Sequence, residues 1–333
     1  MKAIVQDRYG APGSLRIVEV DRPTPKNNEL LVRVHAAALN ARDWHILRGD
    51  PRVMRLMAPA VFGLRGPRRP IRGSDVSGTV VEVGRDVTRW RAGDEVYGDL
   101  GDSDGAFAEY ACLPGTAAER KPTGLTFEQA AAIPLAGRTA LAGLRHAGRV
   151  APGQRVLVNG ASGGVGTFAV QIARALGAEV TGVCSPRNVE LVRSIGADHV
   201  VDYTREDFTR AARPYDLVFD LVGNRSLGEL RRALAPTGTL VLSGGGAPTG
   251  GRPTMFGPLG LMVRGQASSR LVGQRVVVLA VPPVADTLGA LHELVESGQV
   301  VPVIDRTYPL AEVPEALRYL EIEHARAKVV ITV

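Results

Sequence analysis

Residues 155–185 read RVLVNGASGGVGTFAVQIARALGAEVTGVCS and predict a strand, a glycine-rich turn, a helix and a second strand in one unit. Within the turn, Ala161-x-Gly163-x-x-Gly166 follows the spacing of a dinucleotide-binding fingerprint, with Ala in the first place. A helical stripe of apolar residues follows and ends at Gly177. Such a turn places backbone amides and a helix N-terminus beside a pyrophosphate. A turn that only joins strand to helix is the alternative, and the matching context on both sides disfavours it.

The chain around this unit divides into a β-rich part and an alternating part. Residues 1–124 contain short strand patterns, among them ELLVRVHAAAL and GTVVEVG, before any long helix. After the turn, strand and helix patterns alternate as far as RVVVLAV at 275–281, with one helix expected at 206–212. This alternation predicts an α/β fold with a doubly wound parallel sheet. The closing strand KVVITV has no place in that sheet, so we expect it to return to the β-rich part.

Composition and charge describe an ordinary globular chain of 333 residues with a net charge of +6. Arginines gather without acids in residues 52–72 and 244–285, but no helix-turn-helix, zinc finger or interleaved aromatics accompany them, so nucleic-acid binding is not expected. Two cysteines, Cys112 and Cys184, exclude a disulfide framework and a four-cysteine zinc site. We find neither a signal segment nor a membrane-spanning stretch, and therefore expect a cytoplasmic protein.

Seven stretches of the chain together resemble the medium-chain dehydrogenase/reductase superfamily, in particular its zinc-independent quinone oxidoreductase and enone reductase branch. They are GSDVSGTVVEVG, RAGDEVYG, GAFAEYACLP, AAIPLAGRTAL, NGASGGVG, GADHVVDY and ARAKVVITV. The resemblance covers essentially the full chain. It implies a GroES-like β-rich substrate domain formed by residues 1–124 and 282–333, an inserted Rossmann NADP-binding domain at 125–281, and an active-site cleft between them. It also implies a homodimer built through the Rossmann domains.

The zinc-dependent branch of this superfamily has a catalytic Cys where this chain has Asn40, and Gly-His-Glu where it has Gly73-Ser74-Asp75. His35 and His45 lie near the expected cleft, but no spacing groups them with a thiolate or carboxylate as three ligands. We therefore expect no metal at the site. The favoured chemistry is hydride transfer from a reduced nicotinamide cofactor to a small lipophilic quinone or α,β-unsaturated carbonyl compound. A reductase-like scaffold that binds NADPH without turnover is the alternative.

The residue that distinguishes NADH from NADPH is expected about 20 residues after the glycine turn, at the end of the second strand. Ser185 stands at that place, and no acid follows it before Glu190. Ser185 and Arg187 could hold a 2′-phosphate, the latter through a forked charge-assisted contact, so NADPH is the expected cofactor. Ser185 also fits an N-cap with Pro186 as first helical residue, and the two roles are compatible.

Further cofactor contacts are implied by the resemblance. Asn40 and Thr139 would lie near the nicotinamide, and Tyr203 near the adenosine phosphate unless it is only a packed residue at a strand end. The ends of two later strands are also expected to contact the cofactor, because an open α/β sheet binds ligands at strand carboxyl ends. The turn and these strand ends supply Ser162, Gly163, Gly164, Val165, Gly166, Val222, Gly223, Ser243, Gly244 and Gly245.

Four residues at the expected floor of the cleft are catalytic candidates: Asn40, Asp43, Trp44 and His45. Asn40 could donate its amide to nicotinamide or substrate, and His45 could supply a proton near neutral pH. The sequence leaves three alternatives open. His45 could be a structural histidine, Asp43 could serve a turn or an ion pair, and solvent could protonate the product.

Two apolar segments, 54–71 and 255–263, lie within the arginine-containing stretches 52–72 and 244–285 and could border the cleft. One interpretation is a lid over a lipophilic substrate, with arginines reaching outward. The other is peripheral attachment to anionic lipid. We favour the lid because neither segment shows a clean amphipathic helix.

Overall fold

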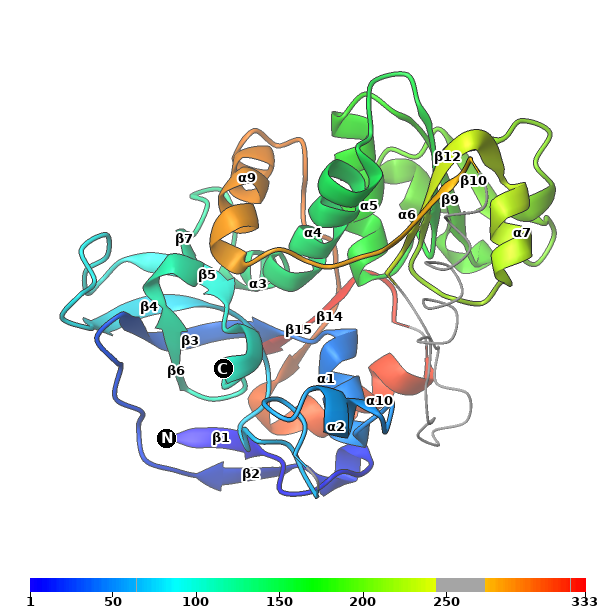
Figure 1. The fold of residues 1–333 in the computed structure, drawn as a ribbon. Helices are drawn as coiled ribbons and strands as arrows, with labels where there is room; N and C mark the ends of the chain where they lie inside the picture. Colours follow the sequence, from blue (N-terminus) through cyan, green and yellow to red (C-terminus); the bar gives the residue numbers. More distant parts are fainter. Residues whose placement is uncertain (64, 244–272, 324) are drawn as a thin grey trace.

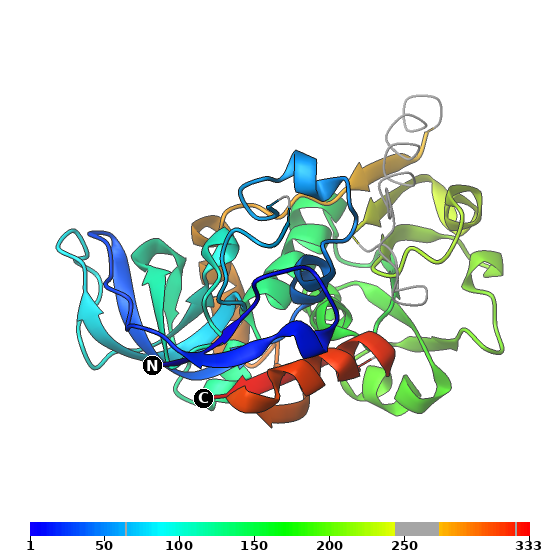
Figure 2. The ribbon, with the colours of Figure 1, turned by 90° about the horizontal axis from the view of Figure 1, so that it is seen from below.

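The computed structural model describes residues 1–63, 65–243, 273–323 and 325–333. These residues form two lobes, one built from both ends of the chain and one from its middle (Figure 1). The two termini lie in the same lobe and close to each other in both views (Figures 1 and 2). A search of the described residues finds no helix that is long and apolar enough to cross a membrane.

The middle lobe is a six-stranded sheet in the order β10-β9-β8-β11-β12-β13, in which every pair of neighbours is parallel. This is the strand order 3-2-1-4-5-6 of dinucleotide-binding folds, and it confirms the predicted doubly wound sheet. The buried strands follow the continuous apolar runs of the sequence because helices cover the sheet. The elements are β8 (Arg155–Asn159), α5 (Gly164–Ala175), β9 (Glu179–Cys184), α6 (Val189–Ser194), β10 (His199–Asp202), β11 (Tyr215–Asp220), α7 (Leu227–Arg232), β12 (Leu234–Leu242) and β13 (Arg275–Val278).

The other lobe is the β-rich part, and its main sheet follows the path β14-β15-β3-β4-β5-β7, with β6 paired to β3. The last strand, β15, runs antiparallel to β3 with Val330 opposite Ala38, which confirms its predicted return. The elements are β1 (Lys2–Val5), β2 (Arg16–Glu19), β3 (Glu29–Ala38), α1 (Ala41–Arg48), α2 (Met54–Met57), β4 (Asp75–Val83), β5 (Glu95–Asp99), β6 (Tyr110–Pro114), β7 (Ala118–Arg120), β14 (Ile304–Pro309), α10 (Val313–Ile322) and β15 (Lys328–Thr332).

Three helices lie where the lobes meet: α3 (Phe127–Ala131), α4 (Pro134–Leu141) and α9 (Val284–Glu296). Pro134 begins α4, so it separates the two helical pieces as the sequence predicted. Ala131 of α3 packs in one cluster with Ala38 and Val330 of the β-rich sheet, whereas Leu288 of α9 packs with the core of the middle lobe. The predicted domain boundaries at 124/125 and 281/282 stay predictions, because the helices that follow them, α3 and α4 after the first and α9 after the second, lie where the lobes meet.

The prediction of a helix at residues 206–212 is wrong. The structure has only a single 3₁₀ turn there, Phe208–Arg210, whose N-cap Asp207 accepts a hydrogen bond from the Thr209 amide. Phe208 is the one large apolar side chain that the segment buries. One anchor supports a turn but leaves a longer helix without an apolar face.

Candidate functional site

The glycine turn connects β8 to α5 in a conformation that requires glycine. Gly160 has a φ of 90°, and the Gly163 amide donates to the Gly160 carbonyl oxygen at 3.1 Å. A Cβ on Gly166 would collide with the same oxygen. The glycine turn therefore packs closely against the N-terminal end of α5, which begins at Gly164 and includes Val165. Backbone amides and the helix N-terminus can approach a pyrophosphate here without obstruction from side chains.

The loop after β11 lies beside this turn and is shaped by a buried acid that the sequence analysis missed. Asp220 Oδ1 accepts hydrogen bonds from the Val222 and Gly223 amides at 3.2 and 3.1 Å, and from Asn159 Nδ2 at 2.8 Å. The Ser243 amide donates to the Asp220 carbonyl oxygen at 3.0 Å. Three strand ends are thus joined at one edge of the sheet, as the topology predicts for ligand binding. Gly244 and Gly245 lie outside the described residues.

The end of β9 brings together the residues predicted for the 2′-phosphate. Asn188 donates from Nδ2 to the hydroxyl oxygens of Ser162 at 3.0 Å and Ser185 at 3.1 Å, so it links the turn to the strand end. Ser185 precedes Pro186 at the start of a 3₁₀ turn, and no side-chain hydrogen bond caps that turn. Arg187 is exposed and donates from Nη2 to the Glu323 carbonyl oxygen at 2.7 Å.

Tyr203 follows directly on β10, and half of its surface is exposed. Its amide donates to the Cys184 carbonyl oxygen at 3.3 Å, which keeps the residue beside the end of β9. The position is therefore adjacent to the Ser185 segment, and the ring is not packed into a core. A role at the adenosine phosphate stays a prediction.

The last strand of the β-rich lobe starts at the glycine turn. The Ala327 amide donates to the Ser162 carbonyl oxygen at 2.7 Å, and Ala327 forms a parallel bridge with Gly163. The next residue, Lys328, is only 2% exposed. The contacts of Ala327 with the glycine turn and the burial of Lys328 were not predicted. A lysine inside the apolar strand pattern of ARAKVVITV was the sequence signal for a buried charge.

Lys328 joins Asn40 and Asp75 in a buried polar cluster at the junction of the lobes. Its ammonium donates to Asn40 Oδ1 at 2.6 Å, to the Leu39 carbonyl oxygen at 3.0 Å and to Asp75 Oδ2 at 3.4 Å. Asn40 Nδ2 donates to Asp75 Oδ2 at 3.0 Å, and Asp75 Oδ1 accepts from the Leu135 amide at 3.0 Å. Burial raises the pKa of Asp75, and the adjacent ammonium acts in the opposite direction.

A second buried ion pair lies on the same junction. Arg138 on α4 donates to Asp99 Oδ2 at 2.6 Å, to the Thr287 hydroxyl at 2.7 Å and to the Pro282 carbonyl oxygen at 2.7 Å. Its neighbour Thr139 donates its hydroxyl proton to the Leu135 carbonyl oxygen at 2.7 Å. The Thr139 oxygen therefore remains available only as an acceptor toward a nicotinamide amide group.

The catalytic candidates on α1 have distinct environments. Asp43 Oδ2 accepts from the Asn40 amide at 2.8 Å, which forms a capping box, and burial raises the pKa of Asp43 to about 6. His45 Nδ1 lies 3.1 Å from the Asp50 carbonyl oxygen, so Nδ1 carries the proton of the neutral ring. Burial lowers the pKa of His45, and Trp44 is buried against its ring edge.

These environments favour a structural role for Asp43 and a neutral His45 at pH 7. A neutral ring with its proton on Nδ1 offers Nε2 as an acceptor, which does not favour proton donation by His45. His35 has no place among the catalytic candidates, since its ring stacks on Phe127 and its Nε2 lies 3.0 Å from the Thr79 hydroxyl. Protonation of the product by solvent needs none of these groups.

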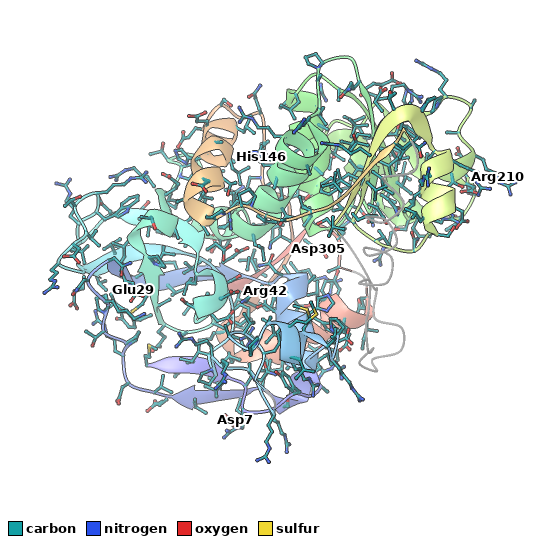
Figure 3. All side chains as sticks on the ribbon, viewed as in Figure 1. Asp7, Glu29, Arg42, His146, Arg210 and Asp305 are labelled. Carbon is teal, nitrogen blue, oxygen red and sulfur yellow. The ribbon has the colours of Figure 1, made fainter. Side chains whose placement is uncertain are left out.

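The first arginine-rich segment is not uniformly a surface feature. Arg72 is 2% exposed and donates to Asp104 Oδ2 at 2.7 Å, and Arg42 donates to Asp104 Oδ1 at 2.6 Å. Figure 3 shows Arg42 in the same lobe as Asp7 and Glu29. Arg72 ends the arginine-rich stretch 52–72, just after the segment 54–71, and a buried carboxylate holds it inside the lobe. The lid over a lipophilic substrate stays a prediction. Leu56 and Met57 are exposed, Leu64 is not described, and residues 255–263 lie outside the described part of the chain.

The residues at the junction do not fit a metal ion. Asn40 and Asp75 bind the Lys328 ammonium group, and this positive charge would repel a metal ion at the same place. Within the described residues, no group of three or more His, Cys, Asp and Glu side chains could hold a metal. Burial raises the pKa of the Cys112 and Cys184 thiols to about 11, so neither is a thiolate at neutral pH.

Comparison with known proteins places the chain among nicotinamide-dependent enzymes. A family described as Alcohol dehydrogenase GroES-like domain matches residues 26–123, and one described as Zinc-binding dehydrogenase matches residues 195–331. The human mitochondrial NAD(P)H oxidoreductase RTN4IP1 is 34% identical over 100% of this chain and 89% of its own length. The tomato 2-methylene-furan-3-one reductase is 33% identical over 99% and 79%. The quinone oxidoreductase of Coxiella burnetii superimposes with a TM-score of 0.84 and 32% identity, over 100% and 99%.

Proposed function

The chain belongs to the quinone oxidoreductase and enone reductase branch of the medium-chain dehydrogenase/reductase superfamily, and on that premise we propose that it uses NADPH to reduce a quinone or an α,β-unsaturated carbonyl compound without a metal. That it is an oxidoreductase follows from the family. The observation that carries the metal-free proposal is the Lys328 ammonium, which lies against both Asn40 and Asp75. These are two of the positions at which the zinc-dependent branch differs.

The proposed choice of NADPH is supported by the end of β9. Ser185, Arg187 and Asn188 offer a hydroxyl, a guanidinium and an amide there, and no carboxylate precedes Glu190 to repel a 2′-phosphate. The glycine turn suits a pyrophosphate, because Gly166 lets the helix pack directly on the turn, where a Cβ would collide with the Gly160 carbonyl oxygen. NADPH bound in this way would supply a hydride at the junction of the lobes, where Thr139 and the buried polar cluster lie.

The proposed acceptors need no Lewis acid, because a quinone or an enone is already electron-poor. The protein would hold the acceptor against the nicotinamide, exclude water and hydrogen-bond the oxygen that gains charge. Asn40 is the described side chain best placed for that hydrogen bond, since one of its Nδ2 hydrogens has only the Ala38 carbonyl oxygen at 3.4 Å as a partner. Solvent would complete the reaction by protonating the enolate or quinol.

The test is a screen of NADPH oxidation by the purified protein against quinones, enones and enals, with identification of the products. We expect turnover that survives treatment with a strong zinc chelator and a protein that contains no stoichiometric zinc. Oxidation of simple alcohols that chelation abolishes would overturn the metal-free proposal. NADPH binding without oxidation across the whole panel would instead indicate a binding scaffold.

We also propose that the protein acts as a cytoplasmic homodimer that pairs through its middle lobes. Family resemblance supports the dimer, whereas compartment varies in the family, since RTN4IP1 is named as mitochondrial. Light scattering coupled to gel filtration would report the mass in solution. A monomer at micromolar concentration would exclude a stable dimer.

A further inference from the structure

Lys328 is buried in a way that stability alone does not explain. It stands at the first position of β15 with 2% of its surface exposed, and its charge partner Asp75 is fully buried. Removal of two charges from water costs several kcal/mol per ion, and a well-packed apolar pair is often at least as stable. The three N–H groups of the ammonium match its three contacts, with Asn40 Oδ1, the Leu39 carbonyl oxygen and Asp75 Oδ2. The shortest of these contacts, at 2.6 Å, is the one with the Asn40 side chain.

The two charged groups determine which way the Asn40 amide faces. A cation lies 2.6 Å from Oδ1, and a carboxylate oxygen lies 3.0 Å from Nδ2. A flipped amide would place the NH₂ group against the ammonium and the carbonyl oxygen against the carboxylate, and both contacts would be repulsive. One hydrogen of Nδ2 is used by Asp75. The second has only a 3.4 Å contact with the Ala38 carbonyl oxygen, which is too long for a strong hydrogen bond.

The same cluster lies at the glycine turn. Lys328 follows Ala327, which bridges Gly163, and its Cδ would lie 3.3 Å from a Cβ on Gly164. Asn40 itself is the residue that precedes α1 in the β-rich lobe, so Lys328 is what connects its amide to the turn. The Asn40 amide is thus held beside the glycine turn, at the junction of the two lobes.

We propose that Lys328 is a positioning residue, which together with Asp75 fixes the Asn40 amide so that its second N–H is offered to a carbonyl oxygen in the cleft. That oxygen belongs either to the nicotinamide carboxamide or to the acceptor. The inference rests on the proposed function, because it assumes hydride transfer at this junction. It assigns to Lys328 a role in catalysis that acts only through Asn40.

The first measurement uses the side-chain amide signals of Asn40. The chain has six asparagines, so protein with ¹⁵N only in asparagine gives few signals, and Asn40→Ala identifies the pair from Asn40. We expect NADP⁺ to shift one of the two Asn40 amide protons if the nicotinamide is the partner. If the acceptor is the partner instead, addition of cyclohexanone, a carbonyl compound that stands in for the acceptor, to the NADP⁺ complex should shift that amide proton. In both cases the proton held by Asp75 stays in place; equal shifts of both protons, or none in either arm, would overturn the inference.

The second measurement uses the double variant Lys328→Met with Asp75→Asn, which removes both charges and leaves no unpaired carboxylate. The Asn40 amide can then turn over, because the amide introduced at position 75 can donate to its oxygen. We expect kcat to fall about tenfold to a hundredfold, as for a small misplacement of a catalytic group, with little change in the Kd of NADPH. Asn40→Ala should reduce kcat in the wild type by a similar factor but add less than twofold in the double variant.

A purely structural role for Lys328 predicts a different pattern. The melting temperature would fall, kcat of the folded fraction would stay within twofold of the wild type, and the effect of Asn40→Ala would be undiminished. Either of the last two results would overturn the inference. If the double variant does not fold, the amide signals of the wild-type protein still decide. If the wild type binds NADPH but reduces no acceptor, the proposed function fails, and the NADP⁺ shift still tests the position of Asn40.

Discussion

Arg187→Ala tests the assignment of NADPH most directly. Arg187 lies in the 3₁₀ turn Pro186–Asn188 after β9, and its side chain is exposed. Its Nη2 donates to the Glu323 carbonyl oxygen at 2.7 Å, which holds the guanidinium beside the strand end without placing it in a core. We therefore expect the variant to fold normally. Any large change in cofactor affinity should come from the lost guanidinium.

The expected magnitude follows from the kind of contact. A hydrogen bond to a charged group contributes about 1.5–3 kcal/mol, and exposure to solvent places this one near the lower value. Each 1.4 kcal/mol corresponds to about a tenfold change in Kd. NADPH affinity should therefore fall about tenfold, and NADH, which has no 2′-phosphate, should lose less than about twofold. The loss should shrink at high salt, because ions screen an exposed charge pair.

The assay is equilibrium binding of NADPH and of NADH, followed by nicotinamide fluorescence at low and high salt. Arg193→Ala is the matched control, since Arg193 is an exposed arginine of the next helix that pairs with Glu190. The control should bind both cofactors as the wild type does. Equal weakening of NADPH and NADH by Arg187→Ala would refute the reasoning, because it would place the effect in the shared part of the cofactor. An unchanged NADPH affinity would refute it as well.

Three further outcomes test other parts of the site. Gly166→Ala should weaken NADPH and NADH alike by at least about tenfold, because its Cβ would collide with the Gly160 carbonyl oxygen, whereas Gly228→Ala has open space and should bind normally. Arg138→Met should lower the free energy of unfolding by about 3–5 kcal/mol in urea titrations, since it leaves a buried carboxylate on β5 unpaired; a loss below about 1 kcal/mol would contradict this. Burial raises the pKa of Asp43 from 3.8 to about 6, so its ionisation lowers stability as the pH rises between these values. Asp43→Asn should therefore gain about 2 kcal/mol relative to wild type between pH 4 and pH 7, and urea unfolding at the two pH values would show no such gain if the carboxyl titrates normally.

The sequence allowed the fold and the cofactor turn to be predicted because both depend on local patterns. The glycine spacing between Gly160 and Gly166 sets a turn that few other residues can form, and apolar runs on either side set the strand and the helix. The alternation of strand and helix patterns after this turn predicted the parallel sheet. Where the local signal was weak, as at residues 206–212, the prediction was wrong, since one buried phenylalanine could not support a helix.

The candidate site was only partly visible in the sequence. Asn40 and Asp75 were found because they differ from residues of the zinc-dependent branch, but their partner Lys328 lies 288 positions from Asn40. Asp220, Asn188 and Arg138 were missed for the same reason, since their partners come from other strands and helices. Hydrogen bonds between distant side chains depend on strand register, which a single sequence does not specify.

By itself, then, the sequence predicted a dinucleotide-binding turn on a parallel sheet, and it has Asn40 and Asp75 where the zinc-dependent branch has residues of its metal site. The tertiary structure decided what takes the place of that site. The return of β15 to β3 brings the Lys328 ammonium to Asn40 and Asp75, and the bridge from Ala327 to Gly163 sets this cluster against the glycine turn. The physical reason is that periodicity and turn chemistry act within a few residues, whereas the pairing of buried charges depends on which distant segments the packed lobes bring together.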